Sequence, residues 1–277
     1  MAPRVSVVVP ALNEALALPR LLKSLAAQTL RPVEVIVADS NSVDDTVALA
    51  RQAGARVVAG GPPAVGRNAG ASVATGELLL FLDADTQPAR TFIAQAVAEF
   101  TRRRLDVATA ALRPIERGAG LLVGAWVTEA YLRAIWRREP RAVGACILVR
   151  KAFHDELGGF DESLRLAEDH DYVRRASEQG RFGLLNNVRI PVSMRRVAAA
   201  GTYTYAKVLV SSEVKTLAGK PVHRLPKGYQ LGGPTDDVDA DAPADADPRG
   251  RWRALARPDT ETQGDLIGVV YAAGGLA

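Results

Sequence analysis

The sequence predicts an α/β protein with a mainly parallel sheet flanked by helices. Over the first 115 residues, short runs of Val, Ile and Leu alternate with segments of helical periodicity. This alternation is typical of parallel sheets with crossover helices. The chain has 277 residues, of which 48% are hydrophobic and 24% charged, so it is long enough to bury a core and ordinary in composition. We therefore expect one large globular domain.

The first unit is strand, helix, strand. Residues 5–9 and 33–38 are short and rich in Val and Ile, as buried strands are. Between them, residues 15–28 carry leucines at helical spacing, and Pro19 fits a helix only in its first turn. The alternation continues with a helix at 44–52 stopped by Gly54, a strand at 56–58, a helix at 67–74 ended by Gly76, a strand at 78–82 and a helix at 90–103.

The second part of the chain is less regular. We expect strands at 106–112 and 145–149, a last strand ahead of Arg195, and helices at 121–137, 151–157, 168–179 and 203–217. These elements define two halves of one domain, 1–115 for the first and 116–220 for the second. Residues 221–277 are expected to be an extended or disordered tail, since 235–248 holds six Asp among Ala and Pro with almost nothing to bury.

Charge is unevenly distributed along the chain. The formal net charge is +4, but residues 231–277 carry nine acidic and four basic side chains, so residues 1–230 carry +9. A basic body favours anionic partners such as nucleotide phosphates or anionic lipid. A single cysteine, Cys146, excludes an intrachain disulfide and favours a reducing, cytoplasmic setting. The sequence shows neither a secretory signal nor an uncharged stretch of about 18 residues that would span a membrane.

Polar side chains follow three of the predicted strands. Asn13 and Glu14 come after the first strand, Asp39 ends the second, and Asp83 and Asp85 follow residues 78–82. Because open parallel sheets bind ligands at the carboxyl ends of their strands, we expect these side chains to meet at one edge. Several oxygen ligands fit Mn²⁺ or Mg²⁺ bound beside phosphate. The sequence lacks the motifs of dinucleotide-binding proteins, P-loop proteins, serine hydrolases and zincins.

Seven motifs in order resemble the series found in family 2 glycosyltransferases of the GT-A fold. They are PALNE (10–14), VADSNSVDDT (37–46), GRNAG (66–70), ATGE (74–77), FLDAD (81–85), GGFD (158–161) and EDHD (168–171). The likeness spans residues 5–196. It implies an inverting, metal-dependent transfer of a sugar from a nucleoside-diphosphate sugar to an acceptor hydroxyl, with an acceptor-binding half smaller than the donor-binding half.

The resemblance implies roles for individual residues. Asp169 would be the catalytic base, and Asp83 and Asp85 would hold the metal. The implied donor-binding residues are Pro10, Asn13, Glu14, Asp39, Arg67, Asn68 and Asp83. Glu168 would then be an acceptor or supporting residue. From their positions in the sequence, Gly159, Arg195 and Arg196 are further candidates for acceptor contact or support. The chain departs from the family at Asp39, which is followed by Ser40 where the family often has a second acid.

Simpler structural roles remain open for several of these residues. Asp39, Asp83 and Asp85 also suit turns, and acids at the start of a helix, such as those at 168–171, are favoured by the helix dipole. Glycines at 158–159 suit a helix C-cap. Arg195 and Arg196 either pair with surface acids or reach the diphosphate. His154 and His223 are expected to be structural and His170 a surface residue.

The helical pattern at 121–136 allows two interpretations. Its apolar stripe predicts a helix packed on the core. Alternatively, Trp126, Tyr131 and Trp136 would lie at the headgroup level of an anionic membrane, with arginines such as Arg133 facing the lipid. The second interpretation implies peripheral membrane contact and a lipid-linked acceptor. No nucleic-acid partner is expected.

Sugar transfer requires a carboxylate that takes the proton of the acceptor hydroxyl and a cation that stabilises the leaving diphosphate. Asp169 and Asp85 are the candidates for these two functions. Two other functions stay open. A sugar-phosphate nucleotidyltransferase has a similar architecture, although residues 10–14 lack its glycine-rich loop with a basic residue. A non-catalytic module would bind nucleotide or anionic lipid on the same fold.

Overall fold

The computed structural model describes residues 3–116, 126, 129–130, 133, 142, 144–164 and 166–195. Within them lies a seven-stranded sheet of order β3-β2-β1-β4-β6-β5-β7. The strands are β1 (Val5–Ala11), β2 (Glu34–Asp39), β3 (Arg56–Ala59), β4 (Leu78–Leu82), β5 (Val107–Pro114), β6 (Cys146–Arg150) and β7 (Phe182–Val192). The helices are α1 (Leu18–Ala26), α2 (Thr46–Gln52), α3 (Pro63–Val73), α4 (Phe92–Arg102), α6 (Lys151–Glu156) and α7 (Glu168–Gln179).

Most of the sheet is parallel, as the sequence predicts. Strand β1 pairs in parallel with both β2 and β4, so that Val7 lies opposite Val35 on one side and Leu80 on the other. Strand β6 is antiparallel to its neighbours β4 and β5, and β7 is parallel to β5. The carboxyl ends of β1, β2 and β4 therefore meet at one edge of the sheet.

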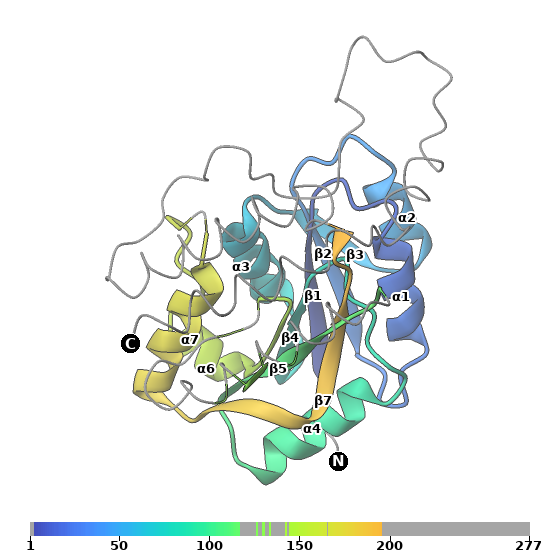
Figure 1. Ribbon diagram of the computed structural model, residues 1–277. Coiled ribbons are helices and arrows are strands. Elements are labelled where there is room, and N and C mark those ends of the chain that lie inside the picture. The colour runs from blue at the N-terminus through green and yellow to red at the C-terminus, as the bar shows by residue number, and fades with distance from the viewer. Residues whose placement is uncertain are drawn as a thin grey trace, which may run out of the picture.

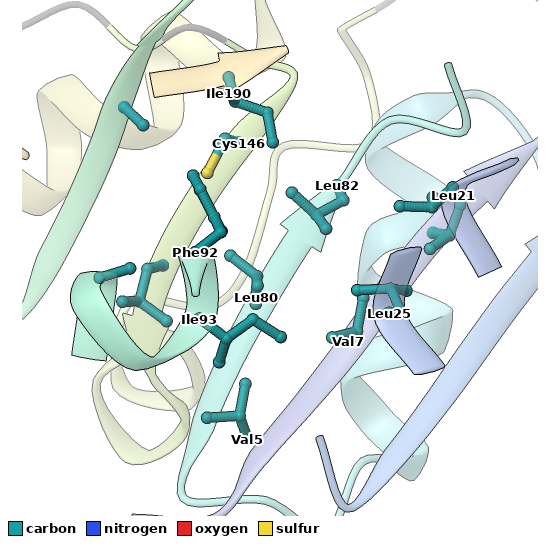
Figure 2. Close-up of a cluster of buried hydrophobic side chains, with 14 of the residues drawn as sticks. Val5, Val7, Leu21, Leu25, Leu80, Leu82, Phe92, Ile93, Cys146 and Ile190 are labelled. Carbon is teal, nitrogen blue, oxygen red and sulfur yellow. The ribbon is translucent and has the colours of Figure 1, made fainter. Parts of the chain in front are cut away.

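Helices cover both faces of this sheet, with α3, α6 and α7 on one side and α1 and α2 on the other (Figure 1). Successive side chains of a strand point to opposite faces, so each strand contributes to two separate buried clusters. One cluster includes Leu21 and Leu25 of α1 together with Phe92 of α4 (Figure 2). The other includes Phe81 of β4 and Tyr172 of α7. Burial on both faces explains why β4 reads as an unbroken apolar run.

Helix α3 starts at Pro63, four residues before the position expected from the sequence. Proline suits the first turn of a helix because its missing N–H has no partner to lose there. The glycines of the segment mislead a prediction based on propensity alone. A side chain at Gly70 would place its Cβ 2.3 Å from Val8 of β1, so this glycine lets the helix pack closely against the sheet.

Some predicted segments lie outside the described residues. They are the helix at 203–217, the tail from 221 and most of the helix at 121–137. Of the last segment, Glu129 is described; it accepts hydrogen bonds from Arg133 and from Arg189 of β7. None of the described helices is both long and apolar enough to cross a bilayer. The division into two halves at residue 115 stays a prediction.

Candidate active site

The loops that follow β1 and β2 are joined by hydrogen bonds between backbone N–H groups and side-chain oxygens. Asn13 N–H donates to Ser42 Oγ (2.9 Å), and Asn13 Oδ1 accepts from the N–H of Val43 (2.9 Å). The N–H of Glu14 donates to Thr46 Oγ1 at the start of α2 (2.7 Å). Asn13 has a φ of 52°, a left-handed conformation that Asn adopts more readily than most residues. These bonds fix both loops at the carboxyl edge of the sheet, and Asn13 has a structural role there.

Asp39 ends β2 and presents one oxygen without a protein partner. Its Oδ2 accepts the N–H of Ser42 at 3.0 Å, as expected of an acid in a turn. Its Oδ1 is buried and has no hydrogen-bond partner among the described residues. Leaving a buried acceptor unpaired is unfavourable by about 1–3 kcal/mol. This oxygen is therefore suited to accept an N–H from a ligand. Pro10 lies beside it on β1, opposite Ala38.

Arg67 of α3 links the end of β4 to the start of α7. Its Nη1 donates to Glu168 Oε1 at 2.6 Å, and its Nη2 donates to Asp83 Oδ1 at 3.1 Å and to the carbonyl of Gly144 at 3.2 Å. The guanidinium lies 5.4 Å from the centroid of the Phe160 ring. The side chain is 3% exposed. Arg67 therefore joins three segments that are far apart in the sequence.

Electrostatics at Arg67 favour its charged form. Burial lowers the pKa of the Arg67 guanidinium, but Glu168, Asp83 and Asp169 together outweigh burial and leave this pKa raised. For Glu168, burial raises the pKa of the carboxyl and Asp169 adds to the rise, while Arg67 opposes both. Arg67 is thus the positive centre of an otherwise acidic cluster.

Asp169 lies on the first turn of α7 and is packed closely against the loop that precedes β6. A Cβ added at Gly144 would lie 2.6 Å from Asp169 Oδ2, so a larger residue at this position would displace the carboxylate. Its Oδ1 accepts the N–H of His170 at 2.9 Å. The side chain remains 16% exposed. Asp169 is therefore held in place and still accessible to a small molecule.

Asn68 fastens the glycine turn after α6 to α3. Its amide nitrogen donates to the carbonyl of Phe160 and its Oδ1 accepts the N–H of the same residue, both at 2.9 Å. Gly158 and Gly159 have φ values of 78° and 72°, as expected for a helix C-cap. A Cβ at Gly159 would lie 2.7 Å from Asn68 Oδ1. In this structure both Asn68 and Gly159 position the turn that carries Phe160.

Arg195 follows β7 and lies between two buried acids. It pairs with Glu14, whose side chain is 2% exposed, and its Nη2 is 3.7 Å from Asp85 Oδ2. The acids that Arg195 contacts are buried rather than at the surface, so pairing with surface acids is not what the structure shows. A contact of Arg195 with the diphosphate stays a prediction. Arg196 lies outside the described residues.

Two further titratable side chains near the site are structural. His154 is buried, and its Nδ1 lies 2.8 Å from the hydroxyl of Tyr172; burial lowers the pKa of His154 to about 4. Cys146 is buried in β6, and burial raises the pKa of its thiol to about 12. The His154 imidazole is therefore neutral and the Cys146 thiol protonated at physiological pH.

The arrangement fits a divalent-cation site whose remaining ligands would come from a bound substrate. Asp83 and Asp85 lie at the end of β4, with side chains 22% and 4% exposed. The described part of the chain contains no group of three or more His, Cys, Asp or Glu residues able to hold a metal by themselves. Mg²⁺ and Mn²⁺ sites of nucleotide enzymes use one or two carboxylates plus phosphate oxygens. The residues present match that donor set.

One surface hollow among the described residues lies away from this site. A hollow of about 540 Å³ is lined by Pro3, Leu30, Ala94, Val97, Ala98, Thr101 and Arg102. These residues lie near the start of β1 and along α4, at the opposite edge of the sheet from Asp83 and Asp85. The chemistry-bearing side chains lie at the carboxyl edge.

Comparison with known proteins identifies the family. Residues 6–158, more than half of the chain, match the family described as glycosyl transferase family 2. The chain belongs to this family. Within the family, it is 41% identical over 92 residues to a 4,4'-diaponeurosporenoate glycosyltransferase of Staphylococcus haemolyticus, which covers 30% of this chain and 24% of that protein. The chain thus spans about a quarter of the length of that relative.

Solved structures of other proteins share the fold of this chain. A mannosyltransferase from Pyrobaculum calidifontis, solved with GDP-Man and Mn²⁺, has a TM-score of 0.62 at 21% identity and covers 99% of this chain and 74% of its own. Glucosyl-3-phosphoglycerate synthase from Mycobacterium tuberculosis, solved with Mn²⁺ and UDP, has a TM-score of 0.52 at 20% identity and covers 79% and 81%. The fold is therefore the GT-A fold that the motifs imply.

The sequence did not identify several residues that build the site. Gly144 contacts both Arg67 and Asp169, Phe160 lies against Arg67, and Thr46 holds the backbone of Glu14. Phe160 and Thr46 lie inside two of the seven motifs, so the motifs already pointed to these positions. Gly144 lies outside every motif, and its role depends on a contact that only the folded chain creates.

Proposed function

We propose that the protein is an inverting, metal-assisted glycosyltransferase that moves a sugar from a nucleoside-diphosphate sugar to an acceptor hydroxyl. One observation carries the proposal. The carboxyl edge of the sheet gathers Asp83 and Asp85, and Arg67 connects Asp83 directly to Glu168, the neighbour of Asp169. A candidate cation site and a candidate base are thereby held by one buried side chain. Family membership supports this assignment.

Asp39 is proposed to recognise the nucleobase. Its buried Oδ1 needs an N–H donor, and the faces of uracil and guanine offer such donors. The loops joined by Asn13 and Ser42 hold this carboxylate in place. Solved relatives contain UDP or GDP-Man, and both kinds of base are compatible with a carboxylate acceptor.

Asp85 and Asp83 are the proposed ligands of Mn²⁺ or Mg²⁺, which would supply positive charge where the leaving diphosphate becomes more negative. Glu14 and Arg195 border this position. Arg67 holds the Asp83 carboxylate through Oδ1.

Asp169 is the proposed base. A sugar hydroxyl is a weak nucleophile, so a carboxylate within hydrogen-bond reach takes its proton as its oxygen bonds to the anomeric carbon. The bond from that carbon to the diphosphate breaks at the same time, with attack from the opposite side, which inverts the configuration. The acceptor oxygen is itself the nucleophile, so the protein provides none. Asn68, Gly159 and Glu168 support the base by positioning α7 and the turn beside it.

The acceptor is proposed to be lipid-linked, reached through peripheral contact with anionic membrane. The described residue that supports this is Trp126, whose side chain is 69% exposed, as an interfacial tryptophan would be. Flotation with vesicles containing anionic lipid tests the contact, and Trp126→Ala should reduce it.

The donor is identified by a thermal-shift screen of UDP-sugars and GDP-sugars with and without Mn²⁺, because a ligand of the folded state raises the melting temperature. Mass spectrometry then follows transfer to sugar and lipid-linked acceptors. We expect Asp169→Asn to reduce turnover about a hundredfold or more while donor binding persists. Asp85→Ala should weaken Mn²⁺-dependent donor binding and abolish transfer.

Glu178→Gln is the matched control, because it removes an exposed acid from the same helix as Asp169. Full activity of Asp169→Asn would refute the assignment of the base. Pyrophosphate release from a nucleoside triphosphate and a sugar phosphate would indicate a nucleotidyltransferase. A protein that binds no nucleotide sugar in the presence of Mn²⁺ would instead be a binding module.

A further inference from the structure

Arg195 lies beside a candidate metal ligand, where a divalent cation would also be attracted. Its Nη2 contacts Glu14 Oε2 and is 3.7 Å from Asp85 Oδ2. All three side chains are largely buried, with exposed fractions of 11% for Arg195, 2% for Glu14 and 4% for Asp85. Glu14 and Asp85 come from loops after different strands, β1 and β4, and Arg195 reaches them from beyond β7.

Two buried carboxylates around one nitrogen require a positive charge. Ionised groups taken out of water are strongly destabilising unless a counter-charge compensates them. Arg195 supplies that charge. A divalent cation bound at Asp85 would supply it too, and two cations beside the same carboxylate oxygen repel each other. Arg195 and the metal therefore compete for Asp85.

Arg195 is also incompletely bonded where it lies. Its Nε is buried and lacks a hydrogen-bond partner among the described residues, which is an unfavourable state for a guanidinium donor. The distance of 3.7 Å to Asp85 exceeds hydrogen-bond length, whereas the contact with Glu14 is direct. The bond with Glu14 is thus the stronger attachment, and the interaction with Asp85 is the one that can be exchanged.

We propose that Arg195 is a built-in counter-cation of Asp85, which a divalent metal replaces when the donor diphosphate binds. Glu14 keeps hold of the guanidinium during this exchange. The inference rests on the proposed function, and it adds the order in which Arg195 and the metal neutralise Asp85. Metal alone binds weakly, because it must displace Arg195 with few ligands of its own. Metal and nucleotide bind cooperatively, because the phosphate oxygens complete the metal site and attract the guanidinium.

The decisive measurement is the affinity for Mn²⁺ in the absence of nucleotide. Isothermal titration calorimetry and the EPR signal of free Mn²⁺ both measure it. Arg195→Met removes the competing charge and keeps most of the side-chain volume. We expect this variant to bind Mn²⁺ alone roughly tenfold or more tightly than the unmodified protein, given the charge separation involved. The gain in Mn²⁺ affinity on adding UDP or GDP should fall by a similar factor, since binding couplings are reciprocal.

Arg189→Met is the matched control. Arg189 lies on β7 and pairs with Glu129, another buried glutamate, but it is bonded to no residue of the Asp85 cluster in the described part of the chain. It should leave Mn²⁺ affinity unchanged. Arg195→Lys keeps a positive charge and should bind Mn²⁺ alone about as weakly as the unmodified protein.

Glu14→Gln provides a test that does not depend on the folding of Arg195→Met. Losing the Glu14 charge leaves Asp85 as the stronger partner of Arg195, so Mn²⁺ alone should bind more weakly. Unchanged or weaker Mn²⁺ binding by folded Arg195→Met overturns the inference, as does tighter binding by Glu14→Gln. Failure of the proposed function looks different, because the unmodified protein would then bind no Mn²⁺ even with UDP or GDP present.

Discussion

At the scale of single residues, Arg67 is the main structural link of the site. It is 3% exposed and bonded to Glu168 and Asp83, which are 85 residues apart in the chain. A buried charge of this kind does not by itself make a protein more stable than an apolar residue would. Its effect is geometric, because it fixes the end of β4 relative to the start of α7.

We expect Arg67→Met to lower the free energy of unfolding by about 3–5 kcal/mol, since two buried carboxylates lose their common partner. Urea titration followed by circular dichroism measures this loss. Arg174→Met is the control, because Arg174 makes its ion pairs on the surface with a side chain 51% exposed; it should change stability by less than about 1 kcal/mol. Equal effects of the two substitutions would show that Arg67 is not a structural centre.

The positions of the candidate site residues were predictable from the sequence where they lie at the ends of strands. The position of Asp39, Asp83 and Asp85 at the carboxyl ends of β2 and β4 follows from local patterns and from one rule about parallel sheets. The pairing of Arg195 with buried acids did not follow, because Glu14 is 181 positions away in the sequence. Contacts of that separation depend on the strand order, which local patterns leave open.

At the scale of elements, the edge strand β7 is tied to α4 by one glutamate. Strand β5 has a register irregularity between Ala110 and Ala111 where it pairs with β7. Close to it, the carboxylate of Glu99 accepts the N–H groups of Asn186 and Asn187, each at 3.0 Å, and a bond from Arg103. Glu99 thus accepts hydrogen bonds from backbone N–H groups of β7 that the β5–β7 pairing skips.

Glu99 should make stability depend on pH. Burial alone raises the pKa of its carboxyl, but the bonds from Asn186, Asn187 and Arg103 outweigh burial and lower it below the usual 4.5. A carboxyl with a lowered folded-state pKa contributes its full stability above the unfolded pKa and loses it as the pH falls toward the folded value. Glu99→Gln should therefore be less stable at pH 7 and lose less stability below pH 4.5.

Urea titrations at a series of pH values from neutral to acidic test this expectation. Glu156→Gln, which removes an exposed acid from α6, serves as the control and should follow the unmodified protein. Parallel curves for Glu99→Gln and the unmodified protein across the acidic range would contradict the role of Glu99.

Elements with strong patterns were predicted well, and those with misleading composition were not. The strand Leu78–Leu82 and the helix Glu168–Gln179 have the predicted bounds. Helix α3 begins at Pro63, before the predicted position, because proline suits the first turn of a helix and Gly66 lies close to Pro10 of β1, whereas average propensity counts both residues against a helix. The antiparallel course of β6 between two strands was also not predictable, since it depends on the connection before it.

At the scale of the whole molecule, the described residues of the candidate site lie at one edge of the sheet. The loops after β1, β2 and β4 lie there with the start of α7, whereas the loops at 74–77 and 103–106 precede strands and lie at the opposite edge. At this edge Arg67 of α3 bonds to Glu168 of α7, and Arg195 reaches Asp85 from beyond β7. Ligand binding should therefore stiffen one edge and leave the other unchanged.

Hydrogen–deuterium exchange measures this asymmetry directly. With Mn²⁺ and the nucleotide diphosphate that binds, we expect slower amide exchange in residues 11–15, 39–46 and 83–86, and at the start of α7. Residues 74–77 and 103–106 are internal controls at the other edge and should exchange at unchanged rates. Protection spread equally over both edges would argue against a single site at the carboxyl ends of the strands.

The place of β7 has a consequence for the order in which the protein matures during translation. Strands β1 to β4 come from the first 82 residues and pair with one another, whereas β7 pairs with β5 and is followed directly by Arg195. A ribosome-bound chain can thus assemble strands β1 to β4 early. The ion pairs of Arg195 with Asp85 and Glu14 at this edge can form only after residue 195 has been synthesised and has emerged.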